Sequence, residues 1–256
     1  MKILLVSGHT SGYNACKATG VNEGDLNIEL VKKIKAQLDP YADVDVYPYD
    51  RDMYKDNLNG CLKVNLKDYK YIFEVHFNAY DGSARGMSVQ LHSNYKGGIS
   101  VEQAIVDNVA AIGFKKRGTN GIVRRSDLLN MNTALRLGID YALIETCFYD
   151  NTAEMTLYKS NKEAVASAIA RGIIDRFGLK SAGTGAAAGQ ATKKTVTVVD
   201  CKALNVRKTP NGSILTEVKA GTILEVIGSG EDSDGDTWTQ VRAGNLTGYV
   251  WPEYIK

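Results

Sequence analysis

The first part of the chain alternates between two hydrophobic patterns. Apolar residues recur every four positions at Leu26, Leu30, Ile34 and Leu38, which predicts one buried face of a helix. Short apolar runs between such segments predict buried strands. The expected strands are residues 2–6, 44–49, 71–77, 87–92 and 141–147, and the expected helices are 23–38, 100–112 and 161–177. Because strands alternate with helices, we expect an α/β fold: a mixed open sheet covered by helices on both faces.

The pattern changes near residue 180. Residues 181–192 carry no charge and no large apolar side chain, so they cannot form a core. After them come short strands separated by turns, which predict a small all-β barrel. These strands are residues 195–199, 203–207, 222–227, 238–242 and 248–251. We therefore expect three parts: a catalytic domain (1–179), a flexible linker (180–193) and a β-barrel (194–256).

Composition excludes several classes of protein. The 256 residues include 31 Lys and Arg against 29 Asp and Glu, a net charge of +2 that gives no support for nucleic-acid binding. The longest apolar run near the start, residues 3–6, is too short for membrane insertion or a signal peptide. We expect a protein made in the cytoplasm without a signal peptide. Four dispersed cysteines predict separate thiols, and oligomeric state stays open.

Four polar side chains fall where ligands of such sheets usually bind. His9 follows the first strand, Glu23 opens the next helix, and His76 and Glu145 lie near the ends of two further strands. Two histidines and one carboxylate form a ligand set of hydrolytic zinc, and a second carboxylate could act as general base. Each histidine could instead hydrogen-bond a loop, and Glu23 could be only a favourable charge at a helix start.

Three further residues bear on this interpretation. Glu145 interrupts an apolar run, and a carboxylate there is costly to bury without a partner. Glu74 shares one face of its strand with His76, so it could support that histidine or compete as the base. Spacing alone leaves His92 as a competing metal ligand.

Four segments carry a resemblance to a known family. They are residues 6–9 (VSGH), 21–27 (VNEGDLN), 75–79 (VHFNA) and 143–148 (LIETCF). In this order and rough spacing they resemble the motifs of the zinc-dependent N-acetylmuramoyl-L-alanine amidases. The resemblance covers about residues 1–178. It implies hydrolysis of the amide bond between N-acetylmuramic acid and L-alanine in bacterial peptidoglycan.

The resemblance also assigns roles. It implies that His9, Glu23 and His76 bind Zn²⁺, that Glu145 is catalytic, and that Asn78 shapes the site for substrate. The sequence departs from the family where VSGH replaces the frequent DPGH, where Gly24 replaces a frequent lysine, and where Glu74 replaces a small or apolar residue. With these departures, the sequence resembles the shorter amidases of phage endolysins more than secreted bacterial autolysins. Such an enzyme would act on the cell wall after release and lyse the host.

The second part has a resemblance of its own. Residues 203–207 (ALNVR), 209–212 (TPNG) and 248–251 (GYVW) are similar to bacterial SH3-like cell-wall-binding domains. The side chains of Trp238, Tyr249 and Trp251, with Tyr254, could form an aromatic face for peptide or sugar, or at least two of them could be barrel core.

Other chemistry stays open. A zinc carboxypeptidase or endopeptidase would share the ligand set, a cysteine–histidine hydrolase would use Cys147 or Cys16, and a non-catalytic wall-binding protein would keep only a vestigial site. Basic residues at 115–117 and 124–125 could meet substrate carboxylates, but a solvated surface is the default expectation for such charges. The acidic segment 231–236 lacks the spacing of a calcium loop, which favours a hairpin turn.

Overall fold

The computed structural model describes residues 1–181, 195–243 and 246–256. The chain divides into two compact units, residues 1–184 and 185–256. Most of the expected linker, 180–193, lies outside the described residues. No helix in the described part of the chain is long and apolar enough to cross a membrane.

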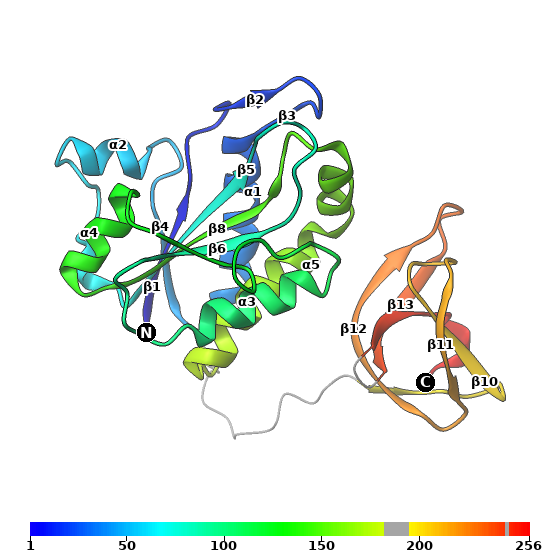
Figure 1. Ribbon diagram of the computed structural model, residues 1–256. Coiled ribbons are helices and arrows are strands. Elements are labelled where there is room, and N and C mark those ends of the chain that lie inside the picture. The colour runs from blue at the N-terminus through cyan, green and yellow to red at the C-terminus, as the bar shows by residue number, and fades with distance from the viewer. Residues whose placement is uncertain (182–194, 244–245) are drawn as a thin grey trace. The chain divides into compact units, whose positions relative to one another are not determined.

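The first unit is built on a six-stranded sheet with the order β4-β1-β5-β8-β6-β7 (Figure 1). Its strands are β1 (Lys2–Ser7), β4 (Asp43–Val46), β5 (Tyr71–Asn78), β6 (Ser88–His92), β7 (Ile122–Arg125) and β8 (Asp140–Phe148). The strands β4, β1, β5 and β8 are parallel, whereas β6 pairs antiparallel with β8 and parallel with β7. The predicted mixed sheet is therefore confirmed, and its direction reverses between β8 and β6.

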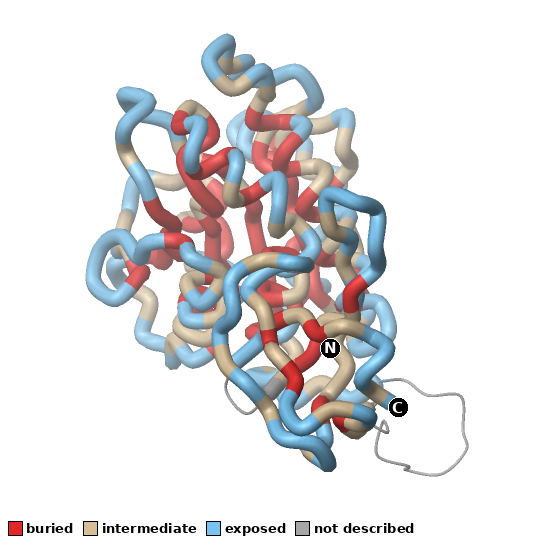
Figure 2. The backbone as a smooth tube through the Cα atoms, turned by 90° about the vertical axis from the view of Figure 1, so that its right-hand side faces the viewer, coloured by how far each residue is buried: buried red, intermediate tan, exposed pale blue. Residues whose placement is uncertain are grey.

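Five α-helices flank this sheet. They are α1 (Glu23–Leu38), α2 (Met53–Leu58), α3 (Ser100–Ala110), α4 (Leu129–Leu137) and α5 (Thr152–Phe177), with a 3-10 turn at Leu66–Asp68. Helices α1, α3 and α5 cover one face, and α2 and α4 lie over the other (Figure 1). Figure 2 shows the buried segments running through the middle of the unit and the exposed ones around it. The prediction of helices on both faces is confirmed.

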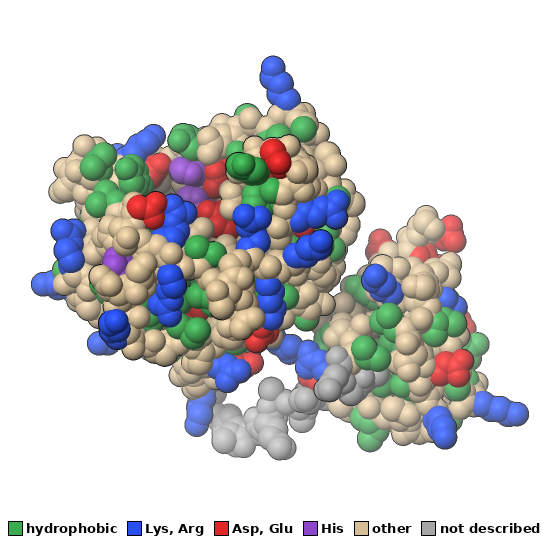
Figure 3. Space-filling view, viewed as in Figure 1, with side chains coloured by type: hydrophobic (Ala, Val, Ile, Leu, Met, Phe, Trp, Pro, Cys, Tyr) green, Lys and Arg blue, Asp and Glu red, His purple; other side chains and the backbone are tan. Residues whose placement is uncertain are grey.

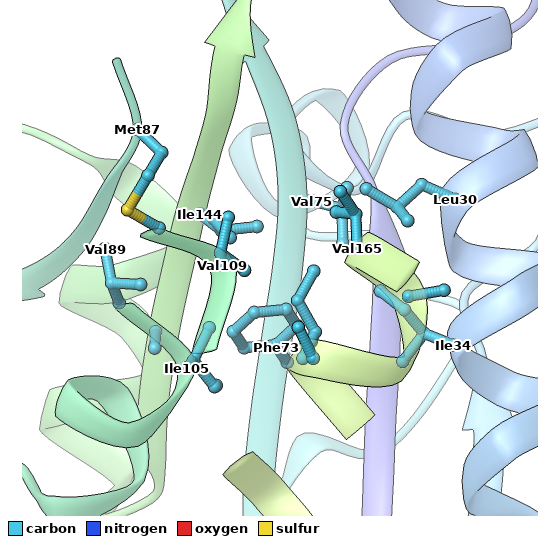
Figure 4. Packing of buried hydrophobic residues seen from close by; sticks show 14 of the residues in the cluster. Leu30, Ile34, Phe73, Val75, Met87, Val89, Ile105, Val109, Ile144 and Val165 are labelled. Atoms are coloured by element: carbon cyan, nitrogen blue, oxygen red, sulfur yellow. The ribbon is translucent and has the colours of Figure 1, made fainter. Parts of the chain in front are cut away.

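Each sheet face has its own core because strand side chains alternate. In β1, Ile3 and Leu5 join the core under α1, while Leu4 and Val6 join the core on the opposite face. Figure 4 shows the larger core, where side chains from α1, α3 and α5 meet side chains of β5, β6 and β8. This double packing holds the strand ends in fixed positions.

Several short elements were not predicted from the hydrophobic pattern. The helices α2 and α4 and the strand β7 are too short to show a clear period, as is a two-stranded hairpin of β2 (Ala15–Cys16) and β3 (Val21–Asn22). Helix α5 begins at Thr152 rather than at residue 161, because two helical segments meet at a kink at Asn161 (φ −133°). The N-terminal segment is capped by Asn151, whose side chain accepts from the Ala153 and Glu154 N–H groups.

The second unit is a six-stranded antiparallel sheet with the order β11-β10-β14-β13-β12-β9. Its elements are β9 (Thr195–Thr197), β10 (Ala203–Arg207), β11 (Ile214–Lys219), β12 (Ile223–Glu231), β13 (Thr237–Ala243), β14 (Leu246–Val250) and a 3-10 turn at Pro252–Tyr254. The strand β11 was not predicted. Thr197 and Lys256 exchange two backbone hydrogen bonds, which join the start of the unit to its end. The all-β prediction is confirmed.

The acidic segment of the second unit is a turn, as predicted. It joins β12 to β13, and the Asp232 carboxylate accepts hydrogen bonds from the backbone N–H groups of Asp234 and Asp236. The same carboxylate accepts from the Trp238 indole N–H at 3.0 Å. These acidic side chains therefore stabilise the hairpin and one tryptophan.

Candidate metal centre and cleft

Three side chains from separate elements converge at one end of the first sheet. His9 follows β1, Glu23 is the first residue of α1, and His76 lies near the end of β5. One possible ligand atom from each lies within 4.8 Å of the other two. The Glu23 carboxylate lies 2.9 Å from His76 Nδ1 and 3.6 Å from His9 Nε2. Two imidazole nitrogens and a carboxylate oxygen fit a zinc site that leaves a fourth position for water or substrate.

Glycines let the backbone approach these side chains. A Cβ on Gly8 would lie 2.1 Å from the His76 ring, so only glycine fits there. The Gly8 N–H donates to the carbonyl of Val75, which ties the end of β1 to β5. The next residue, His9, adopts a left-handed conformation (φ +67°), which turns the chain away from the strand. The VSGH segment therefore sets the position of both histidines.

Gly24 has a similar role beside Glu23. A Cβ at this position would lie 1.9 Å from the Thr10 carbonyl oxygen, so the lysine frequent in the family has no room here. The preceding loop crosses the start of α1 closely at this point. Asn22 caps the helix by accepting the Asp25 N–H, as its sequence position indicates. The Asn14 amide donates to Glu23 at 2.9 Å and orients the carboxylate.

Glu74 contacts His76, and both of its carboxylate oxygens accept hydrogen bonds. One oxygen accepts from His76 Nε2 at 3.0 Å, and the other accepts from the Asn130 amide and the Tyr141 hydroxyl. Burial alone would raise the pKa of Glu74, but the hydrogen bond from His76 and the other two donors hold it below its usual value. A carboxylate that fixes Nε2–H leaves Nδ1 free for a metal. The structure therefore places Glu74 as a support for His76.

The charges around His76 favour its protonated form in the absence of a metal. Burial lowers the pKa of His76, but the hydrogen bonds to Glu23 and Glu74 raise it well above its usual value. Burial likewise raises the pKa of Glu23, but the hydrogen bonds from His76 and Asn14 and the charges of the two histidines together lower it below its usual value. A metal cation would replace the proton on Nδ1 beside Glu23, and Nε2–H would keep its hydrogen bond to Glu74. This charge pattern fits a divalent cation.

His9 also has an acidic neighbour. Its Nδ1 lies 3.6 Å from Asp52, a residue that the sequence analysis did not single out. Asp52 caps α2 by accepting the N–H groups of Tyr54 and Lys55. The interaction with His9 lowers the pKa of Asp52. Each histidine of the candidate centre thus has a carboxylate near its other ring nitrogen.

Glu145 stands beside this centre with few partners. It pairs in register with His76 on the neighbouring strand β8. Its Oε1 accepts from the Gln90 amide at 3.4 Å, and its buried Oε2 has no hydrogen-bond partner among the described residues. Burial raises the pKa of Glu145 to about 7, a value suited to proton exchange near neutral pH. The structure therefore brings together the four side chains that the sequence analysis selected for the chemistry: His9, Glu23, His76 and Glu145.

A cleft of about 310 Å³ opens over these groups. Figure 3 shows histidine and acidic side chains meeting in a hollow of the first unit, with Lys and Arg side chains around it. The cleft floor contains His9, His76, Glu145 and Gln90. One wall carries Tyr13, Tyr54 and Lys55, and the other carries Arg125, Leu128 and Leu129.

His92 does not belong to this centre. Because β6 runs antiparallel to β8, its last residue lies toward the start of β8, away from Glu145. There His92 Nδ1 accepts the backbone N–H of Asn94. The direction of β6 decides this point, and the hydrophobic pattern carries no information about strand direction.

The remaining predicted residues have mixed surroundings. Asn78 ends β5, and its backbone carbonyl accepts the N–H of Tyr149. In the second unit, Trp238 is 6% exposed and packs edge-on against Trp251 at 5.0 Å, while Tyr249 is half-buried. Trp238 therefore contributes mainly to packing. Substrate roles for Asn78, Trp238, Tyr249 and Trp251 stay predictions.

The cysteines are separate thiols, as predicted. Burial raises the pKa of the Cys147 thiol well above its usual value, which disfavours a thiolate nucleophile. The pKa of Cys16 is lowered, chiefly by a hydrogen bond with Thr19 and not by a histidine. Neither thiol has the paired histidine that a cysteine–histidine hydrolase requires.

Four functional neighbours were missed by the sequence analysis: Asp52, Asn130, Tyr141 and Gln90. Gln90 carried a usable signal, because a polar residue inside an apolar strand needs a partner just as Glu145 does. Asp52 reaches His9 from the start of α2, whereas Asn130 on α4 and Tyr141 on β8 reach Glu74.

Comparison with known proteins agrees with this geometry. Residues 3–175 match the family described as N-acetylmuramoyl-L-alanine amidase, and residues 202–256 match the bacterial SH3 domain. The chain is 30% identical over 192 residues to a probable autolysin of Staphylococcus aureus, which covers 67% of this chain and 38% of that protein. It is 25% identical to the endolysin of Bacillus phage SPP1, covering 85% of this chain and 80% of that one.

Solved structures show the same fold in the first unit. The catalytic domain of the CD27L endolysin targeting Clostridia difficile aligns with a TM-score of 0.56 at 26% identity, covering 68% of this chain and 97% of that domain. An N-acetylmuramoyl-L-alanine amidase from Clostridium difficile 630 aligns with a TM-score of 0.58 at 16% identity, covering 69% and 96%. The chain belongs to the N-acetylmuramoyl-L-alanine amidase family and carries a bacterial SH3 domain.

Proposed function

We propose that this protein is a zinc-dependent N-acetylmuramoyl-L-alanine amidase that degrades bacterial peptidoglycan as a phage endolysin does. The observation that carries the proposal is the convergence of His9, Glu23 and His76 within 4.8 Å, beside Glu145. Family membership and similarity to an autolysin and an endolysin support the choice of substrate.

His9, Glu23 and His76 would hold the zinc ion, with Glu74 fixing the His76 ring through Nε2. A zinc ion held by this set lowers the pKa of water to about 7 and polarises a carbonyl group. Glu145 is the group in the cleft with a free buried oxygen and a pKa raised to about 7. It can therefore accept a proton and return it within one reaction cycle.

The reaction follows from these positions. Glu145 takes a proton from the attacking water as the water oxygen bonds to the lactyl carbonyl carbon of N-acetylmuramic acid. The carbon–nitrogen bond then breaks, and Glu145 delivers this proton to the departing alanine nitrogen. The products are a lactyl carboxylic acid on the glycan, which loses its remaining proton to solvent and becomes a carboxylate, and a stem peptide with a free alanine amine.

The second unit would hold the enzyme on its polymer. Its bacterial SH3 domain supports binding to the cell wall. Peptidoglycan repeats the same bond many times, so attachment raises the effective substrate concentration without changing the catalytic cleft. We infer that removing residues 194–256 leaves activity on small muropeptides and weakens action on intact walls.

The deciding experiment measures new amino termini released from purified peptidoglycan. Alanine termini that disappear with a chelator and return with zinc would support the proposal. Termini of other residues would identify a zinc carboxypeptidase or endopeptidase instead. Wall binding without any release would indicate a vestigial site, and release that a thiol-alkylating reagent abolishes would indicate cysteine chemistry.

A further inference from the structure

The two walls of the cleft differ in chemistry. We name Tyr13, Tyr54 and Lys55 the aromatic wall. Tyr13 stacks on His9 with ring centroids 4.1 Å apart, and the Lys55 amino group lies 5.7 Å from the Tyr13 ring centroid. Tyr13 and Tyr54 are 39% and 50% exposed, so two aromatic side chains face solvent beside the candidate metal centre. Exposed aromatic side chains at a cleft are typical of ligand contact.

The opposite side carries Arg125, Leu128 and Leu129, which we name the aliphatic wall. Arg125 is held in place by a two-point contact with Asp127 and by donation from its Nη1 to the Gln90 side-chain oxygen at 3.2 Å. These contacts use three of the five guanidinium N–H groups, and the other two have no partner among the described residues. This wall offers aliphatic surface and a fixed hydrogen-bond donor.

The order of the strands sets a direction across the site. Going from β1 through β5, β8 and β6 to β7, the residues in order are His9, His76, Glu145, Gln90 and Arg125. Along the sheet, Glu145 therefore lies between the candidate metal ligands and Arg125 of the aliphatic wall. Helix α4, which begins at Leu129, packs over β8 and β6 and also against α2, the helix that carries Tyr54 and Lys55.

The two sides of the scissile amide bond can be assigned to this direction across the sheet. The carbonyl must lie at the metal ligands, and the nitrogen must lie within reach of Glu145, which protonates it. We propose that the N-acetylmuramic acid sugar lies against the aromatic wall and that the stem peptide crosses β8 and β6 to the aliphatic wall. This inference rests on the proposed amidase function and adds the orientation of its substrate.

Each wall suits its proposed occupant. The apolar face of a sugar ring packs on an aromatic side chain, and its hydroxyls can accept from the Lys55 ammonium. Leu128 and Leu129 offer a surface for the methyl groups of an alanine-containing peptide. The two open N–H groups of Arg125 match a peptide carboxylate or carbonyl.

The experiment uses the full-length Glu145→Gln variant loaded with zinc, which holds substrate without cleaving it. A disaccharide tetrapeptide carries a photoreactive diazirine either on the glycan end or on the last peptide residue, and mass spectrometry locates the labelled segment. We expect the glycan label near Tyr13 or Tyr54 and the peptide label within residues 125–130. Labels that exchange walls, mark one wall together or mark neither overturn the proposal.

Matched variants give a second readout that does not depend on labelling. Tyr54→Ala should weaken binding of a glycan-extended muropeptide about tenfold, and Leu129→Ala should weaken binding of a peptide-extended one by a similar factor. Tyr41→Ala and Leu137→Ala change exposed residues outside the cleft and serve as controls. Equal losses for both ligands in each wall variant would contradict the inference. Failure of the wild-type protein to release alanine would reject the amidase function itself, whichever wall each label marks.

Discussion

The carboxylates on the two sides of the proposed catalytic site have opposite surroundings. On the ligand side, Glu23 and Glu74 receive several hydrogen bonds, and their pKa values are held below the usual range. On the base side, Glu145 has one distant donor and one unpartnered oxygen, and burial raises its pKa to about 7. Three carboxylates within one site are thus separated into two kinds by their surroundings. The well-partnered ones suit a fixed cation, and the other suits proton transfer.

The largest effect should come from breaking the ligand side. His76→Ala removes the ring that contacts both Glu23 and Glu74, so the cation or proton donor between these two carboxylates is lost. We expect loss of stoichiometric zinc, measured by metal analysis, together with loss of amidase activity. Lys162→Ala, which removes a surface ion pair with Glu29, is the matched control and should keep both. Full zinc content in His76→Ala would refute the ligand assignment.

Changing the base side should separate metal binding from catalysis. Glu145→Gln keeps the shape of the side chain but cannot take up a proton. We expect kcat to fall by about 10²- to 10⁴-fold, the usual contribution of a general acid–base group, with zinc content unchanged. Activity and metal content measured on one preparation test this together. Unchanged activity would mean that another group is the base.

The support behind His76 should have an intermediate effect. Glu74→Gln keeps a hydrogen-bond acceptor but removes the charge that fixes the His76 ring, so we expect zinc affinity to fall about 10- to 100-fold. Tyr141→Phe removes only one donor to Glu74 and should cost less. Competition with a chromogenic chelator gives both affinities. If Glu74→Gln lowered kcat with unchanged zinc affinity, Glu74 would be acting as a base.

The sequence was informative where side-chain type and local pattern are sufficient. His9 and His76 could be placed at strand ends, Glu23 at a helix start and Glu145 inside an apolar run, because each position depends on a few neighbouring residues. The exclusion of His92 depends on the reversed direction of β6, which is a property of the whole sheet.

Residues that contact the site from distant parts of the chain could likewise not be predicted from local sequence patterns. Asp52 approaches His9 from a helix of six residues, and Asn130 reaches Glu74 over 56 positions of sequence. Such contacts are set by tertiary packing, so periodicity and propensity carry no signal for them. The supports of the ligand side were therefore harder to predict than the ligands.

The smallest effect should come from the single donor on the base side. Arg125 can only donate hydrogen bonds, so its contact with the Gln90 oxygen turns the Gln90 amide nitrogen toward Glu145. This donor stabilises the charged form of Glu145, and Gln90→Leu should raise the pKa of the base. Since the base must be ionised to act, activity falls as pH drops through that pKa, and the acid limb of the kcat/KM profile should move to higher pH.

The acid limb should move to higher pH in Gln90→Leu regardless of the pH at which it lies in the wild type. Burial places the pKa of Glu145 at about 7, and a bound cation moves the limb to lower pH in the wild type and the variant alike. We expect a shift of about half a pH unit, which is a loss of kcat/KM of about threefold at pH values below the limb, with little change on the alkaline side. Gln103→Leu, at a partly buried position of α3 that does not line the cleft, is the control. A Gln90→Leu profile that falls equally at every pH would show that Gln90 supports the fold of the cleft and does not tune its base.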